Sequence, residues 1–244
     1  MKEMSKGKLY AMGTGPGASD LITVRAARLL GKLDVLYAPA GRKGGDSLAL
    51  SIVREYLGEQ VQLEERHFPM TANADEKAEV WDAVAQDIEN DVRAGKQVGF
   101  ITLGDSMLFA TWVFLLERLH HKNLPMEVIP GISSYSCIAS AAQFPLAMEQ
   151  QSMAVMSCTA EPEVLTAALQ NHECVVLMKV YGRFQQIREL LRELDLVDHA
   201  VMMANASMDT EVTYRDLMAV PDDEKLPYFS TIVVNRAWSA KVSG

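Results

Sequence analysis

Short apolar runs alternate with amphipathic segments along most of this chain. The runs of Val, Ile, Leu and Met are as long as one buried strand, and the segments between them carry apolar residues at helical spacing. In the first half, strands are expected at residues 9–12, 34–38, 61–66, 98–103 and 126–129. Helices are expected at residues 20–30, 46–57, 75–93 and 108–119, and from residue 134. Asp20 is a suitable N-cap for the first helix.

The same alternation begins again after residues 144–151, "FPLAMEQQ". Pro145 breaks a helix there and polar residues follow it, which is typical of a boundary. Further strands are expected at residues 153–157, 174–179, 199–204 and 230–235. Helices are expected near Pro162, a residue type favoured at the first helical position, and near Arg183. Two blocks of strand–helix alternation predict two α/β domains, residues 1–146 and 147–244, with a cleft between them.

Composition and charge narrow the class of protein. Of the 244 residues, 49% are hydrophobic and 23% are charged, as in a soluble globular protein. No apolar run approaches the ~20 residues of a membrane span, and the polar start "MKEMSKGK" predicts no signal peptide. Cys137, Cys158 and Cys174 lie far apart among apolar neighbours, so we expect buried thiols and a cytoplasmic protein. The net charge of −9 disfavours nucleic acid as a partner, although a local basic pocket remains compatible with an acidic small molecule.

Three turns rich in Gly, Pro and Ser follow expected strands. They are "GTGPG" (13–17), "GDSML" (104–108) and "IPGISSY" (129–135). The first has neither the G-x-G-x-x-G spacing of a dinucleotide fold nor the G-K-[ST] of a phosphate-binding loop, so alone it predicts only a tight turn. Open α/β sheets bind ligands at the carboxyl ends of their strands, where all three turns fall. Their shared position therefore predicts a ligand site more strongly than any one of them does.

Ser106 and the histidines raise two other interpretations, a serine hydrolase and a metal site. "GDSML" is similar to the Gly-Asp-Ser-Leu turn of one esterase class, in which Ser106 would be the nucleophile. Such a serine needs a base within hydrogen-bond reach, and none lies nearby in the sequence. The structural alternative is a strand-end turn in which Asp105 caps the following helix. His120 and His121 are neighbours that do not share a helix face, so no metal site is expected.

Taken in order, these turns resemble the tetrapyrrole methylases, which use S-adenosylmethionine in a cleft between two α/β domains (class III methyltransferases). The matching stretches are "GTGPGASDLITVRAARLL", "ITLGDSMLFATWVFLL", "VIPGISSYSCIASAAQFPL", "VVLMKVYGRF", "MMANASM" and "STIVVN". Ser106 replaces the proline that is usual in the family, and residues 109–111 read Phe-Ala-Thr where one branch has Tyr-Ser-Thr. If the contacts of this turn are mainly through its backbone, the serine need only preserve the turn, so function is expected to survive.

Within the family, "HFPM" (67–70), a following helix with Trp81, and "LMKVYGRF" are similar to one branch. That branch methylates C20 of precorrin-2 or cobalt-factor II in cobalamin biosynthesis. The uroporphyrinogen-III methylases tend to have an aspartate where this chain has Ala38. The alternatives are a methylase of another corrin-ring carbon or another tetrapyrrole, and a methylase of diphthine or ribosomal RNA. A serine hydrolase using Ser106 and a non-catalytic binding protein also remain open.

The resemblance implies site residues as well as activity. The cofactor contacts would be Pro16, Leu103, Gly104, Asp105, Leu108, Ser133, Ser134, Met178, Ala206 and Thr231. The carboxylates of the substrate need cations, for which Arg42, Lys43, Lys179 and Arg183 are the candidates. Methyl transfer from a sulfonium is an in-line displacement that rests on positioning more than on a strong base, and the motifs identify no catalytic base. The family resemblance also implies a homodimer.

Overall fold

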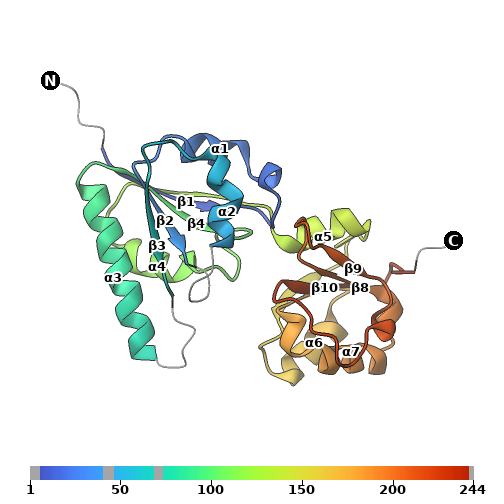
Figure 1. Cartoon of the computed structure of the whole chain (residues 1–244). Coiled ribbons are helices and arrows are strands. Elements are labelled where there is room, and N and C mark those ends of the chain that lie inside the picture. The colour runs from blue at the N-terminus through green and yellow to red at the C-terminus, as the bar shows by residue number, and fades with distance from the viewer. Residues whose placement is uncertain (1–5, 41–46, 69–73, 242–244) are drawn as a thin grey trace. The chain divides into compact units, whose positions relative to one another are not determined.

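The computed structural model describes residues 6–40, 47–68 and 74–241. Its contacts divide the chain into two compact units, Met1–Ser133 and Ser134–Gly244. Each unit contains one five-stranded sheet with helices packed against both faces (Figure 1). The expected α/β fold with two α/β units is therefore confirmed.

The sheet of the first unit is entirely parallel and has the strand order β3-β2-β4-β1-β5. Its strands are β1 (Lys8–Gly13), β2 (Val35–Pro39), β3 (Gln62–Arg66), β4 (Gln97–Thr102) and β5 (Met126–Ile129). β4 is buried from its second residue onward, as its continuous apolar run predicts for a strand covered on both faces. Because β1, β4 and β5 are parallel neighbours, their carboxyl ends come together at one end of the sheet.

Helices cover both faces of this first sheet (Figure 1). They are α1 (Val24–Leu30), α2 (Leu48–Val53), α3 (Ala74–Arg93) and α4 (Trp112–Leu119). Successive side chains of a strand point to opposite faces. Leu9 and Phe100 accordingly pack in the cluster beneath α3 and α4, while Met12 and Ile101 pack beneath α1 and α2. In the part of the chain that the structure describes, no helix combines the length and apolar character of a membrane span.

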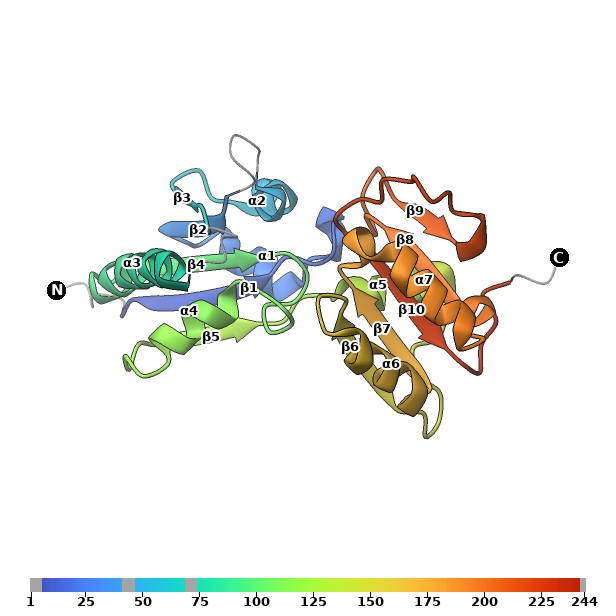
Figure 2. The same cartoon turned by 90° about the horizontal axis from the view of Figure 1, so that it is seen from below.

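The sheet of the second unit is mixed and has the order β6-β7-β10-β8-β9. Its strands are β6 (Met153–Ser157), β7 (Cys174–Met178), β8 (Ala200–Ala204), β9 (Val212–Tyr214) and β10 (Ser230–Asn235). β6 and β7 are parallel, whereas β10 runs antiparallel to both β7 and β8. The helices are α5 (Ser134–Ala142), α6 (Pro162–Asn171) and α7 (Phe184–Glu193). α6 and α7 cover one face (Figure 2), and α5 packs in the cluster on the other.

The division between the units falls between Ser133 and Ser134. The boundary expected after residue 146 lies inside the second unit. The reason is that α5 packs on the second sheet, where Ile138 and Ala142 join the core cluster that contains Val176 and Val233. The composition change at Pro145 therefore marks the end of a helix that already belongs to the second unit.

Two capping predictions were wrong. Asp20 lies in a short 3-10 helix, and α1 begins later, with the Thr23 hydroxyl accepting a hydrogen bond from the Ala26 N–H at 3.2 Å. Asp105 does not cap α4, which begins only at Trp112. In both places an extra turn separates the loop from the helix, and apolar spacing does not reveal such a turn. Pro162 does occupy the start of α6, as predicted.

Candidate active site

Two of the three glycine-rich turns are joined by backbone hydrogen bonds at the carboxyl ends of β1 and β4. The Gly15 N–H donates to the Gly104 carbonyl at 3.2 Å, and the Gly104 N–H donates to the Gly15 carbonyl at 2.7 Å. The Thr14 N–H donates to the carbonyl of Thr102 at 2.9 Å. The turn containing Pro16, which is itself buried, is thereby fixed against the turn containing Gly104.

The third turn, after β5, is held against the other two by close backbone approach. A Cβ added at Gly131 would lie 2.1 Å from the Gly104 carbonyl oxygen and 2.8 Å from the Gly13 Cα. A Cβ added at Gly13 would lie 2.7 Å from the backbone N of Gly131. Real Cβ atoms essentially never come closer than 3.0 Å to another heavy atom. These glycines are therefore required for the turns to pack on one another, which sequence spacing alone did not indicate.

Gly15 and Gly104 are required for a second reason, since their φ angles are +79° and +72°. An L-residue pays a steric penalty in this left-handed region, and glycine does not. A Cβ at Gly104 would have one neighbour within 4 Å, the Ile132 carbonyl oxygen at 3.9 Å. The Gly104 backbone is thus open on its side-chain side, and a ligand could approach it closely there.

Asp105 connects the turn after β4 with the turn after β5. Its Oδ1 accepts a hydrogen bond from the Met107 N–H at 2.9 Å, and its Oδ2 accepts one from the Gly131 N–H at 2.9 Å. The carboxylate therefore satisfies two backbone donors that the turns would otherwise leave without a partner. The side chain bonds to the turns themselves and does not cap α4, which was the structural alternative to the cofactor contact implied by the resemblance.

Ser106 is buried, with no exposed surface, and accepts a hydrogen bond from the Thr102 hydroxyl at 3.2 Å. A nucleophilic serine must reach its substrate and must be paired with a base. Ser106 has no exposed surface, and its hydrogen-bond partner among the described residues is the Thr102 hydroxyl, which is not a base, so the hydrolase interpretation does not fit. The hydroxyl holds the turn closed against β4 at the position where the family usually has proline.

The three packed turns, residues 13–17, 104–108 and 129–135, form what we call the junction of turns. The other residues of the first unit that the sequence predicted as cofactor contacts lie in these turns or beside them. Leu103, Leu108 and Ser133 are half-buried in the turns after β4 and β5. Phe109, directly after "GDSML", is exposed and has a φ of +47°, which is strained for a bulky residue. The turns after β1, β4 and β5 contain no Lys or Arg, so a ligand there would meet backbone groups and uncharged or acidic side chains.

In the second unit, the predicted cofactor residues lie near the carboxyl ends of β7 and β8. Met178 ends β7 and is the register partner of Thr231 on β10. Ala206, just beyond β8, is 5% exposed and packs with Met178 in the cluster beneath α5. Ser134 opens α5 and is half-buried.

The structure treats the four basic residues predicted to bind the substrate carboxylates in different ways. Arg42 and Lys43 lie outside the described residues. Lys179 follows β7 in a left-handed conformation, with φ of +61°. The Arg183 guanidinium donates to the carbonyl oxygens of Cys158 at 2.9 Å and Ala160 at 2.7 Å, so it already fixes the loop after β6. This internal role weakens the case for Arg183 as a substrate ligand.

Burial disfavours the thiolate form of all three cysteines, of which Cys158 and Cys174 are buried and Cys137 is half-buried. Burial raises the pKa of Cys158 to about 12 and that of Cys174 to about 11, and it also raises the pKa of Cys137. A thiol becomes a good nucleophile or metal ligand only as thiolate. Among the described residues, no group of three or more His, Cys, Asp or Glu side chains is placed to hold a metal ion.

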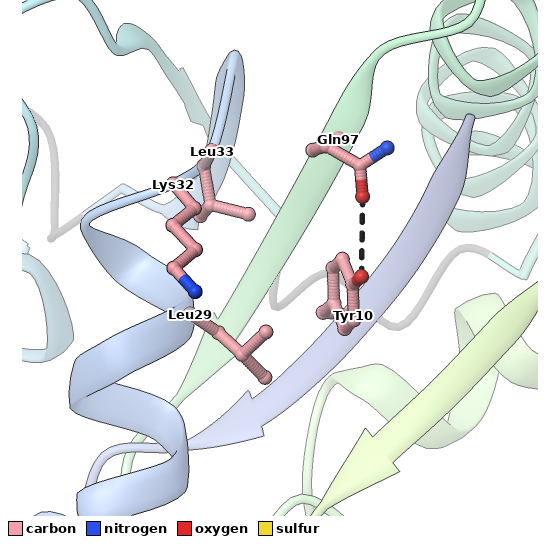
Figure 3. A pocket seen from close by; sticks show the side chains of 5 residues that line it. All are labelled: Tyr10, Leu29, Lys32, Leu33 and Gln97. Atoms are coloured by element: carbon pink, nitrogen blue, oxygen red, sulfur yellow. Dashed lines mark hydrogen bonds between the residues drawn. The ribbon is translucent and has the colours of Figure 1, made fainter. Parts of the chain in front are cut away.

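A pocket of about 340 Å³ is lined by side chains from β1, from the start of β4 and from the end of α1 with the residues after it (Figure 3). Tyr10, near the start of β1, and Gln97, the first residue of β4, form one wall and are joined by a hydrogen bond of 3.1 Å. Leu29, Lys32 and Leu33 form the other wall, around the end of α1. These elements place the pocket toward the amino ends of the strands, so it is not part of the junction of turns.

The sequence of the chain identifies its relatives. Residues 8–220 match the profile of the family described as tetrapyrrole (corrin/porphyrin) methylases. The chain belongs to this family. The methylase is 59% identical to cobalt-precorrin-2 C(20)-methyltransferase from Salmonella typhimurium, over 95% of this chain and 98% of the relative. It is 30% identical to precorrin-2 C(20)-methyltransferase from a Sinorhizobium species, over 96% and 97% of the two chains.

Solved structures of the family share the fold of this methylase. A cobalt precorrin-4 methyltransferase matches with a TM-score of 0.73, at 22% identity and over 97% of this chain and 98% of that one. A uroporphyrin-III C-methyltransferase from Thermus thermophilus, solved in complex with S-adenosylhomocysteine, matches with a TM-score of 0.67 at 22% identity, over 95% of this chain and 99% of that one. At 22% identity, these two similarities establish a shared fold and nothing further.

Sequence reasoning missed the residues that hold the junction together. Thr102 and Gly131 lie inside the matching stretches but received no role, and "GTGPG" taken alone predicted only a tight turn. Glycines placed directly after neighbouring parallel strands were the available signal, because such positions meet at one end of the sheet.

Proposed function

We propose that this methylase transfers the methyl group of S-adenosylmethionine to C20 of cobalt-precorrin-2, a step of cobalamin biosynthesis. The observation that carries the proposal is 59% identity to a cobalt-precorrin-2 C(20)-methyltransferase across nearly the full length of both chains. Identity to the relative named precorrin-2 C(20)-methyltransferase, a name without cobalt, is 30%. The larger identity favours the cobalt-bearing ring as the substrate.

The residues at the junction of turns fit the proposed cofactor. The turns after β1, β4 and β5 are small and carry no Lys or Arg, and the Gly104 backbone is open to a ligand. We propose Pro16, Leu103, Gly104, Leu108 and Ser133 from the first unit, and Ser134, Met178, Ala206 and Thr231 from the second, as the cofactor-binding residues. When bound, S-adenosylmethionine supplies an activated methyl group on its sulfonium.

The role of the protein in this reaction is positioning. An in-line methyl transfer needs the acceptor carbon close to the methyl group and opposite the carbon–sulfur bond that breaks, and a rigid scaffold contributes mainly by this orientation. The backbone bonds between Gly15 and Gly104 and the carboxylate of Asp105 provide such rigidity for the loops of the first unit. We propose that Lys179 binds a carboxylate of the substrate, and we propose the same role for Arg42 and Lys43. We also propose a cytoplasmic homodimer.

The proposal is tested by methyl transfer with two matched substrates. The protein is incubated with S-adenosylmethionine and either cobalt-precorrin-2 or metal-free precorrin-2, and the mass of the tetrapyrrole is followed over time. We expect a mass increase of one methyl group, with a larger kcat/KM for the cobalt-bearing ring. Failure of S-adenosylhomocysteine to bind in calorimetry would contradict the methylase proposal, and a preference for the metal-free ring would overturn the choice of substrate.

A further inference from the structure

The two carboxylate oxygens of Asp105 serve two different turns. Oδ1 binds the Met107 N–H within its own turn, whereas Oδ2 binds the Gly131 N–H, 26 residues away in the turn after β5. The second bond therefore joins two segments that are distant in sequence. It lies beside the close contact of Gly131 with Gly104 and Gly13.

We propose that Asp105 is a positioning residue for the methyl-transfer reaction. Its carboxylate holds the turns after β4 and β5 together, and it sets cofactor affinity through their main chains rather than through a side-chain bond to the cofactor. This inference rests on the proposed function. It changes the role expected for Asp105, because the resemblance had placed this residue among the cofactor contacts.

The geometry requires a carboxylate. Two N–H donors approach two separate oxygens, and an ionised carboxylate is the side chain that accepts at both. An asparagine at this position has one oxygen, and its NH₂ group would face the second N–H donor. One turn would then keep its bond and the other would lose it. Hydrogen bonds to a charged partner are also stronger than neutral ones.

Asp216 offers a matched control in the second unit. It caps the short 3-10 helix Leu217–Ala219, where its Oδ1 accepts from the Met218 N–H at 3.0 Å and from the Ala219 N–H at 3.3 Å. The local geometry resembles that of Asp105 and Met107. Both bonds go to the same oxygen, however, so an asparagine preserves both of them at Asp216.

The experiment compares Asp105→Asn and Asp105→Ala with Asp216→Asn. Affinity for S-adenosylhomocysteine is measured by calorimetry, and global stability by thermal unfolding without ligand. Amide hydrogen exchange of the segment containing Gly131 is followed in the ligand-free protein. For Asp105→Asn we expect affinity to fall by roughly tenfold or more, the size of a lost charge-assisted hydrogen bond. We expect Asp216→Asn to bind like the wild type.

Amide hydrogen exchange and steady-state kinetics distinguish a positioning role of Asp105 from a direct bond between its side chain and the cofactor. If Asp105 acts through the turns, Asp105→Asn accelerates exchange at Gly131 before any ligand is added. The KM for S-adenosylmethionine then rises by about the same factor as the dissociation constant, while kcat stays within about threefold, because saturating cofactor restores the junction. A side-chain bond to the cofactor would weaken binding and leave exchange in the ligand-free protein unchanged, which would overturn the proposal.

Other outcomes are equally decisive. Wild-type affinity in Asp105→Asn contradicts the positioning role. If both Asp105 variants fail to fold, Asp105 is a determinant of global stability and the proposal is wrong. If the wild-type protein itself binds no S-adenosylhomocysteine, the proposed function fails, a result distinct from any result with the variants.

Discussion

Replacement of Gly131 by alanine tests whether backbone contact between turns builds the site. The added Cβ would lie 2.1 Å from the Gly104 carbonyl oxygen and 2.8 Å from both the C and Cα atoms of Gly13. All three are backbone atoms, so no side chain can rotate away. Restoring ordinary contact requires the turn after β5 to move by more than about 1 Å. Overpacking of this kind costs about 1–3 kcal/mol, and we expect the upper part of that range.

Thermal unfolding and ligand binding measure this effect together. For a chain of this size, each 1 kcal/mol lowers Tm by about 2–4 °C, so Gly131→Ala should lower it by roughly 5–10 °C. S-adenosylhomocysteine binding should weaken at least tenfold, because the displaced turn carries Gly131 away from the Asp105 carboxylate. Gly31→Ala is the control, since its Cβ would meet the Tyr56 carbonyl oxygen at an ordinary 3.6 Å. It should change neither measurement appreciably.

A Gly131→Ala protein with wild-type Tm and wild-type affinity for S-adenosylhomocysteine would refute this reasoning. It would mean that the turns can separate without consequence, and that close packing of the three turns is not what forms the site. A lower Tm with unchanged affinity would separate stability from binding and would count against the junction as part of the cofactor site.

Three further predictions concern single side chains. Ser106→Ala removes the acceptor of the Thr102 hydroxyl. It should lower the free energy of unfolding, measured by chemical denaturation, by about 1 kcal/mol, while methyl transfer persists. Loss of all activity would contradict a purely structural role. Phe109→Gly should be more stable than Phe109→Ala by up to about 1 kcal/mol, because φ is +47° there; the reverse order would show that the turn is unstrained. Hydrogen bonds from the Ser152 side chain and backbone lower the pKa of Glu173 to about 2. Glu173→Gln should therefore be less stable than the wild type at neutral pH, and the difference should disappear as pH falls from about 4.5 to about 2; a difference that persists at the acid end would disprove this assignment.

Much of the fold could be predicted from hydrophobic patterning. The strands β1, β2, β4, β5, β6, β7, β8 and β10 all coincide closely with expected apolar runs. β9 was missed because it has three residues and two of them are exposed, so it carries no apolar signal. The start of α1 was placed too early because Asp20 is a good capping residue by type, whereas the chain makes a 3-10 turn before Thr23 provides the cap.

The candidate site could be located from the sequence but not assembled from it. Glycine-rich turns after neighbouring parallel strands indicated one end of the first sheet, and the family resemblance supplied the ligand. The bond from Gly131 to Asp105 and the contact between Gly131 and Gly104 depend on strand order. Strand order is a long-range property that local spacing does not encode. Residue types alone likewise could not show that Ser106 is turned inward.

The position of the transferred methyl group tests the central claim most directly. S-adenosylmethionine labelled at its methyl carbon is incubated with the protein and cobalt-precorrin-2, and the product is examined by NMR. The account predicts one labelled methyl group attached to C20. A label at any other ring carbon, or no label in a preparation that binds S-adenosylhomocysteine, would contradict it.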